Sequence, residues 1–126
     1  MGISGFEEMT RLAKVARPDI CVLTNIGVAH MENLGSRDGI LKAKTEMFAY
    51  MNENGTIILN GDDDKLRGYS PENGITPVYF GLDESCGFHA KIFPAKFKRN
   101  GRTVFHTKFF FYGTYQHPGR SHGVQR

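Results

Sequence analysis

Ile20-Cys21-Val22-Leu23-Thr24-Asn25-Ile26-Gly27 is an apolar run that passes into polar residues and a glycine turn. A short, nearly continuous apolar run of this kind predicts a β-strand buried on both faces, as in a parallel sheet. Ligands of open parallel sheets lie beyond the carboxyl ends of the strands. We therefore expect the residues that follow the run, from 24 to 30, to line a ligand site.

Helical and strand patterns alternate around this run. Apolar residues at helical spacing predict a helix over residues 6–16, with Ser4 as its N-cap, and a second over residues 36–51, with Ser36 as its N-cap. Pro18 ends the first helix. The alternation predicts an α/β fold with a parallel sheet and flanking helices. Two further strands and a short helix are expected at residues 56–59, 76–81 and 62–69, respectively.

The pattern changes after Phe88, where two antiparallel strands are expected at residues 90–97 and 103–111. A turn at Arg99-Asn100-Gly101-Arg102 would join them into a hairpin. We expect residues 1–111 to form one partial α/β domain, of which residues 88–111 are the antiparallel part, rather than two independent domains.

The composition is that of a globular protein, with 126 residues, 40% of them hydrophobic and 23% charged. This length allows one small domain. No apolar run is long enough to span a bilayer, and the first nine residues contain two glutamates and no basic segment of the kind that opens a signal peptide. These features predict a cytoplasmic location and no membrane partner.

The two cysteines, Cys21 and Cys86, show neither a metal-binding spacing nor a disulfide framework. Cys21 is expected to be a small buried apolar residue. The net charge of +3 is unevenly placed, because the residues after Phe88 include many Lys and Arg and neither Asp nor Glu. A basic end is compatible with nucleic acid, but no recognised nucleic-acid motif accompanies it, so we expect a solvated surface and no nucleic-acid partner.

Two groups of charged residues are candidates for chemistry. Lys42 and Lys44 lie two positions apart on a predicted helix, so their side chains point in different directions, and solvation of both is the simplest interpretation. Asn60-Gly61-Asp62-Asp63-Asp64 follows the second predicted strand. Its carboxylates could bind a metal ion, but helix capping is the favoured role.

Taken together, these motifs resemble the central ATPase domain of the Mur ligases. The resemblance is carried by Thr24-Asn25-Ile26-Gly27-x-Ala29-His30-x-Glu32-x-x-Gly35-Ser36, by the two lysines and by Asn60-x-Asp62-Asp63, and it covers about residues 1–92. Ala29-His30 and Leu41-Lys42-Ala43-Lys44 favour the branch that joins D-alanyl-D-alanine to UDP-N-acetylmuramoyl-tripeptide, a step of peptidoglycan precursor synthesis.

The resemblance implies ATP and Mg²⁺ as cofactors, UDP-N-acetylmuramoyl-tripeptide and D-alanyl-D-alanine as substrates of the full-length protein, and a monomer. ATP would convert a carboxylate into an acyl phosphate, which the incoming amine attacks to form an amide. His30 would lie near the second magnesium ion and the γ-phosphate. Lys44 would carry a carbamate that binds magnesium. Thr24, Asn25 and Asn60 would contribute to nucleotide binding.

The chain also departs from the family pattern. It contains no Gly-x-x-Gly-Lys-Thr/Ser phosphate loop, and the magnesium-binding glutamate of the family would precede Met1. We therefore expect the chain by itself to be inactive. With a shift of one base, codons permitted for residues 118–125 can encode a family motif, so residues 112–126 are expected to be a disordered or out-of-frame tail. The alternative function is a non-catalytic α/β module that binds a nucleotide or a partner.

Overall fold

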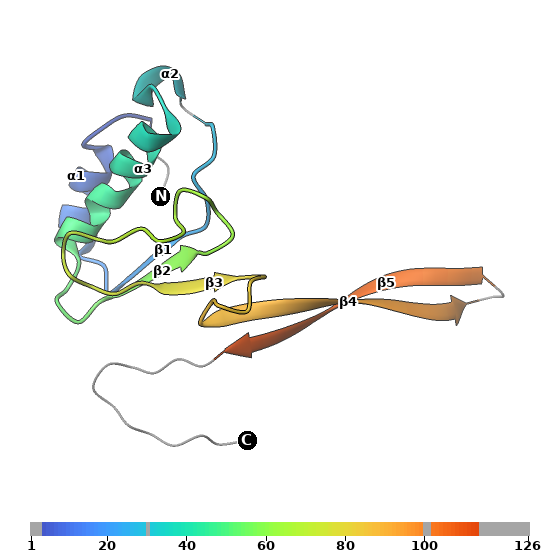
Figure 1. Cartoon of the computed structure of the whole chain (residues 1–126). Helices are drawn as coiled ribbons and strands as arrows, with labels where there is room; N and C mark the ends of the chain where they lie inside the picture. Colours follow the sequence, from blue (N-terminus) through green and yellow to red (C-terminus); the bar gives the residue numbers. More distant parts are fainter. Residues whose placement is uncertain (1–3, 30, 100–101, 114–126) are drawn as a thin grey trace.

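The computed structural model describes residues 4–29, 31–99 and 102–113 (Figure 1). Within these ranges no helix is both long and apolar enough to cross a membrane. His30 and the tail from residue 114 onward, for which the sequence raised specific expectations, lie outside them. The elements are α1 (Glu8–Ala16), β1 (Ile20–Leu23), α2 (Met31–Leu34), α3 (Arg37–Thr45), the 3₁₀ helix η1 (Glu46–Tyr50), β2 (Thr56–Asn60), β3 (Val78–Gly81), β4 (Phe88–Arg99) and β5 (Arg102–Gly113).

The strands form one five-stranded sheet in the order β1-β2-β3-β4-β5. The first four strands are parallel, and β5 pairs antiparallel to β4 along its whole length. This topology confirms the predicted α/β fold with a C-terminal hairpin. Because Phe88 of β4 pairs with Phe80 of β3, the hairpin continues the parallel sheet. Figure 1 shows the hairpin projecting from the helical part as a long twisted ribbon.

Strand β1 is buried on one face only, which corrects the prediction that both faces are covered. Cys21 and Leu23 are buried, whereas Ile20 and Val22 remain 62% and 50% exposed. Helices α1 and α3 lie on one side of the sheet (Figure 1), and no described element covers the opposite face of β1. An apolar run fixes a strand, but the layers around it decide which of its faces is buried.

The hydrophobic core lies between that face of the sheet and the helices. Each element from α1 to β2 contributes to it, as does the loop that follows β2. The buried side chains are Met9, Ala13, Cys21, Leu23, Ile26, Leu34, Ile40, Ala43, Met47, Phe48, Ile57, Leu59 and Leu66.

The N-terminus of α1 is capped from another part of the chain. The predicted Ser4 cap is wrong, because the helix begins at Glu8 and its N-cap residue is Glu7. The carboxylate of Glu46 in η1 accepts hydrogen bonds from the backbone N–H groups of Glu7 and Thr10, at 3.1 and 3.3 Å, and from the Thr10 hydroxyl at 3.1 Å. A carboxylate at this position satisfies free amides and interacts favourably with the helix dipole.

The predicted helix over residues 36–51 begins where expected, but its α-helical part ends earlier than expected. The Ser36 hydroxyl accepts a hydrogen bond from the Gly39 N–H at 3.1 Å, as expected of the N-cap. The α-helical part ends at Thr45 and continues as the 3₁₀ helix η1.

Residues 62–69 form turns instead of the predicted helix. The Asp63 carboxylate accepts hydrogen bonds from the N–H groups of Lys65 and Leu66, at 2.9 and 3.1 Å, and Gly68 adopts a φ of +74°. Such a glycine leaves the right-handed helical region, which ends any helix at that point.

Candidate functional site

The predicted ligand-binding edge is centred on residues 24–27, which we call the β1 exit. The strand ladder between β1 and β2 stops at the Leu23–Leu59 pair. One residue further, the side-chain amide of Asn60 donates a hydrogen bond to the Thr24 carbonyl at 2.9 Å. The Lys44 ammonium donates a hydrogen bond to the Asn25 carbonyl, also at 2.9 Å. The structure thus brings together four of the five residues predicted for the site.

Ile26 is the most firmly held residue of the β1 exit. Its N–H donates a hydrogen bond to Asp63 Oδ2 at 2.8 Å, and its carbonyl accepts one from Arg37 Nε at 2.9 Å. Its side chain is 1% exposed. The backbone N–H and the carbonyl of Ile26 are therefore both bound by charged side chains from other parts of the chain.

Arg37 is itself anchored by the loop after β2. Its two terminal nitrogens donate to the two carboxylate oxygens of Asp64, at 2.6 and 2.9 Å, and one of them lies 3.9 Å from Asp63. The hydrogen bond between Arg37 and Asp64 raises the pKa of the guanidinium and lowers the pKa of the carboxyl. This bidentate geometry fixes the guanidinium plane as well as its position.

The two candidate lysines have different surroundings. Lys42 is exposed, whereas Lys44 is partly buried and reaches Asn25. Lys44 and Thr24 also line a cavity of about 270 Å³ beside β1. Arg37 and Lys44 stand seven positions apart on α3, which is close to two helical turns, so both lie on the face turned toward the β1 exit.

The three adjacent aspartates are each bound to a different part of the chain. Asp62 accepts a hydrogen bond from the Leu82 N–H at 2.7 Å, Asp63 closes its own turn, and Asp64 pairs with Arg37. Asp63 therefore closes a turn rather than capping a helix, so the helix-capping prediction is wrong, because residues 62–69 form no helix. Within the described ranges, no group of three His, Cys, Asp or Glu side chains could hold a metal ion.

The donors available for magnesium at this edge are few. Magnesium prefers oxygen ligands and commonly shares them with phosphates, keeping several waters. The exposed side chains of Thr24 and Asn25 offer oxygens next to the Lys44 amine. The described residues offer no carboxylate cage at this edge, so an ion bound here would take most of its oxygen ligands from a phosphate group and from water.

A larger cavity, of about 440 Å³, adjoins the same edge where the ribbon joins the body. Asn60 and Asp62 line it on one side. Its other walls include the rings of Phe80, Phe88, His89 and Tyr112. The His89 and Tyr112 rings are stacked, with centroids 5.4 Å apart and planes 18° apart.

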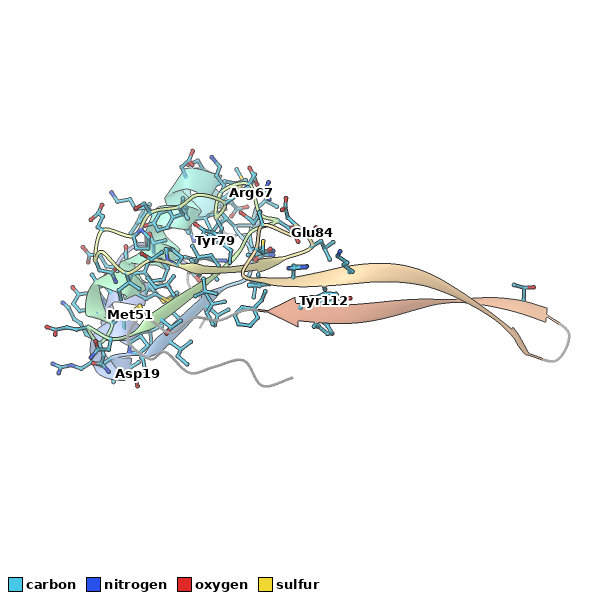
Figure 2. All side chains as sticks on the ribbon, turned by 60° about the horizontal axis from the view of Figure 1, so that its bottom comes forward. Asp19, Met51, Arg67, Tyr79, Glu84 and Tyr112 are labelled. Carbon is cyan, nitrogen blue, oxygen red and sulfur yellow. The ribbon has the colours of Figure 1, made fainter. Side chains whose placement is uncertain are left out.

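An ion pair stands beside this cavity. Lys91 binds Glu84 at 2.6 Å and lies over the Tyr112 ring, 5.8 Å from its centroid. Figure 2 shows Glu84 and Tyr112 at the base of the ribbon. Sequence reasoning missed this cavity because its walls come from four strands whose pairing is needed to bring them together. The aromatic residues of the hairpin were the available signal.

Comparisons with known proteins agree on one family. The family model described as the Mur ligase middle domain matches residues 1–119. The UDP-N-acetylmuramoyl-tripeptide–D-alanyl-D-alanine ligase of Bacillus subtilis is 45% identical over 67 residues, which are 53% of this chain and 15% of that protein. The ligase of the same name from Escherichia coli is 34% identical over 79 residues, which are 63% of this chain and 18% of that protein.

Solved structures give the same result. The MurF ligase from Thermotoga maritima, in complex with ADP, matches with a TM-score of 0.63 and 28% identity over 86% of this chain. MurF from Acinetobacter baumannii matches with a TM-score of 0.65 and 24% identity, which shows the fold. This chain spans 25% of the length of either structure, and less than a fifth of the two curated relatives.

Proposed function

This chain belongs to the Mur ligase family through its middle domain, and on that premise we propose that it is part of an ATP-dependent ligase. The reaction we propose is the addition of D-alanyl-D-alanine to UDP-N-acetylmuramoyl-tripeptide, the activity that the names of its relatives state. The observation that carries the proposal is the convergence of Lys44 and Asn60 on the β1 exit. We also propose that the full-length protein is a cytoplasmic monomer.

In the proposed reaction, the tripeptide carboxylate attacks the γ-phosphorus of ATP, and ADP leaves. The amine of D-alanyl-D-alanine then attacks the acyl carbon, and an amide forms while inorganic phosphate and a proton are released. Positive charge and hydrogen-bond donors that face the phosphoryl group accelerate such a transfer. We assign Lys44, at the carboxyl edge of the sheet, to this task through its carbamate, which would hold the magnesium ion that faces the phosphoryl group, and His30 is its proposed neighbour.

The nucleotide would use the two parts of the site differently. A phosphate group fits beside Lys44 and the polar side chains of Thr24 and Asn25. The cavity of about 440 Å³ has aromatic walls and the Asn60 amide at its rim, which suits a flat base with a polar edge. Support for a nucleotide comes from the Thermotoga relative, which was crystallised with ADP.

Magnesium, when bound, would neutralise charge on the transferring phosphate. We propose Lys44, as a carbamate, and His30 as its protein ligands. The surroundings of Lys44 agree with this role, because a partly buried amine beside a carbonyl is less solvated than an exposed lysine.

A chimera tests the function. The matching 67 residues of the Bacillus ligase are replaced by those of this chain, and phosphate release is followed with ATP, Mg²⁺ and both substrates. We expect activity that depends on D-alanyl-D-alanine and that falls roughly a hundredfold with Lys44→Met. Lys42→Met, on the same helix, is the matched control and should leave activity within about threefold. A folded chimera in which Lys44→Met is as active as its parent contradicts the proposal.

The 126 residues by themselves are proposed not to turn over, because they contain no phosphate-loop pattern. The same phosphate-release assay on the isolated chain checks this, and clear turnover refutes it.

The alternative function is a non-catalytic nucleotide-binding module, and the one observation that favours it is the aromatic cavity. It predicts that titration calorimetry of the isolated chain detects ATP binding that Asn60→Ala weakens while Lys44→Met has no effect.

A further inference from the structure

We propose that Asp63 and Arg37 are positioning residues that orient the peptide group between Asn25 and Ile26 and thereby hold Lys44 at the site. This inference rests on the function proposed for Lys44 and concerns the unmodified ammonium, which is the form that the structure contains. It concerns two residues that touch neither Lys44 nor, in the proposed reaction, the phosphate.

One peptide group connects the two contacts. The Asn25 carbonyl and the Ile26 N–H belong to the same planar trans unit, so they point in opposite directions. The N–H donates to Asp63 Oδ2 at 2.8 Å, and the carbonyl accepts from Lys44 Nζ at 2.9 Å. The peptide plane therefore lies between an anion on one side and a cation on the other, with its dipole aligned to both.

The opposite orientation of this peptide group is electrostatically unfavourable. A flip would direct the carbonyl oxygen at the Asp63 carboxylate and the N–H at the Lys44 ammonium. The Asp63 side chain is only 9% exposed, so water screens such a repulsion weakly. Asp63 thus selects the orientation in which Lys44 finds an acceptor.

Arg37 fixes the next peptide group along the chain. Its Nε donates to the Ile26 carbonyl at 2.9 Å, while its terminal nitrogens bind Asp64. Two consecutive peptide groups are consequently held, one by Asp63 and one by Arg37. Because Arg37 and Lys44 are both on α3, the same helix supplies the cation and part of the support of its acceptor.

Asp63→Asn separates this role from a local structural one. In the native protein Oδ1 accepts the N–H groups of Lys65 and Leu66, and Oδ2 accepts the Ile26 N–H. An asparagine can keep its oxygen toward the turn, and its amino group then faces the Ile26 N–H, so that two donors meet. The turn is retained while the contact with the β1 exit is lost.

Nuclear magnetic resonance of the full 126-residue chain provides the test. In Asp63→Asn we expect hydrogen exchange of the Ile26 amide to accelerate by about tenfold or more, while the Lys65 and Leu66 amides keep their protection. We also expect the hydrogen-bonded ammonium signal of Lys44 to disappear, although residue 63 does not contact it. A purely local role of Asp63 leaves that signal unchanged.

Two further variants complete the experiment. Arg37→Gln should weaken the Lys44 ammonium signal without accelerating hydrogen exchange of the Lys65 amide. This variant replaces Asp63→Asn in the test if Asp63→Asn does not fold. Arg67→Gln breaks a comparable ion pair, with Asp83 at 2.6 Å, and should change neither Ile26 nor Lys44.

The outcomes separate the two proposals. Unchanged Ile26 exchange or an unchanged Lys44 signal in both site variants overturns the positioning role, whatever the ligase chimera shows. The expected changes, together with a chimera indifferent to Lys44→Met, support the positioning role and overturn the proposed function instead.

Discussion

The body of the molecule, residues 4–87, and the ribbon formed by β4 and β5 are held together by different forces. The described residues of the buried hydrophobic cluster lie in the body, between Met9 and Leu66. In the ribbon, none of the described side chains is buried, and the two strands are joined by a continuous antiparallel ladder from Phe88–Gly113 to Arg99–Arg102. Figure 1 shows the ribbon extending well beyond the helices.

This difference explains where a well-defined site can form. A two-stranded ribbon is marginally stable unless another layer covers it. In the body, helices packed on the sheet bring charged side chains of α3 and of the β2 loop to one strand end. Among the described residues of the ribbon, those at its base, including Phe88, His89 and Tyr112, line the neighbouring cavity.

The largest expected effect tests the body. Leu59→Ala should lower the free energy of unfolding by about 2–5 kcal/mol, because the side chain is fully buried in the core. Urea denaturation measures it. Leu82→Ala, at a residue 53% exposed, is the control and should change the value by less than about 0.5 kcal/mol. Equal effects of the two substitutions contradict the description of the core.

An effect of intermediate size is expected on the pH dependence of the free energy of unfolding, through the buried Cys21 of the body. Burial raises the pKa of the Cys21 thiol to about 11, so the folded state favours the protonated form. The contribution of this thiol to the free energy of unfolding is fully present below the unfolded-state pKa of about 9. It is lost as the pH rises through 11, and the free energy of unfolding then falls by about 2 kcal/mol. Urea denaturation at pH 8.5 and 11 should show this loss in the native protein.

The loss should be largely absent in Cys21→Ala and retained in Cys86→Ala, whose cysteine lies outside the core cluster, near the ribbon. The same pH slope in all three proteins shows that other groups cause it.

A smaller effect is expected at the remote cap of α1. Glu46→Gln removes the charge and one of the two equivalent acceptor oxygens that bind Glu7 and Thr10, and should destabilise the body by about 1 kcal/mol. Thermal unfolding followed by circular dichroism measures the change. Glu53→Gln, at an exposed position, is the matched control. If the two variants have the same melting temperature, the Glu46 cap does not stabilise the body.

The smallest effect is expected from shortening the ribbon. Replacement of residues 96–105 by Asn-Gly, a two-residue hairpin turn, should change the free energy of unfolding by less than about 0.5 kcal/mol. The core cluster, as far as the described side chains go, is built from residues between Met9 and Leu66. A large loss in urea denaturation indicates that the ribbon and the body unfold as one tightly coupled unit, and the comparison then fails.

Part of the fold and of the site could be predicted because it depends on residues close in sequence. The parallel strands, the hairpin and the Ser36 cap follow from local patterns. The positions of Thr24 and Asn25 at the ligand edge followed from the rule that ligands lie beyond the carboxyl ends of parallel strands, whereas Asn60 was expected there from the family resemblance. The capping role of Glu46 was not predictable, since the backbone groups that it binds are 36 and 39 positions away.

By itself, the sequence determined the order of the strands and of the two long helices, the location of the candidate ligand edge and the family resemblance, because local backbone preferences and apolar periodicity depend on neighbouring residues. The tertiary structure decided which face of β1 is covered, which backbone carbonyl Lys44 binds and how Asp63 and Arg37 hold the β1 exit. These features depend on contacts between residues far apart in the chain, and packing alone brings such residues within hydrogen-bonding distance.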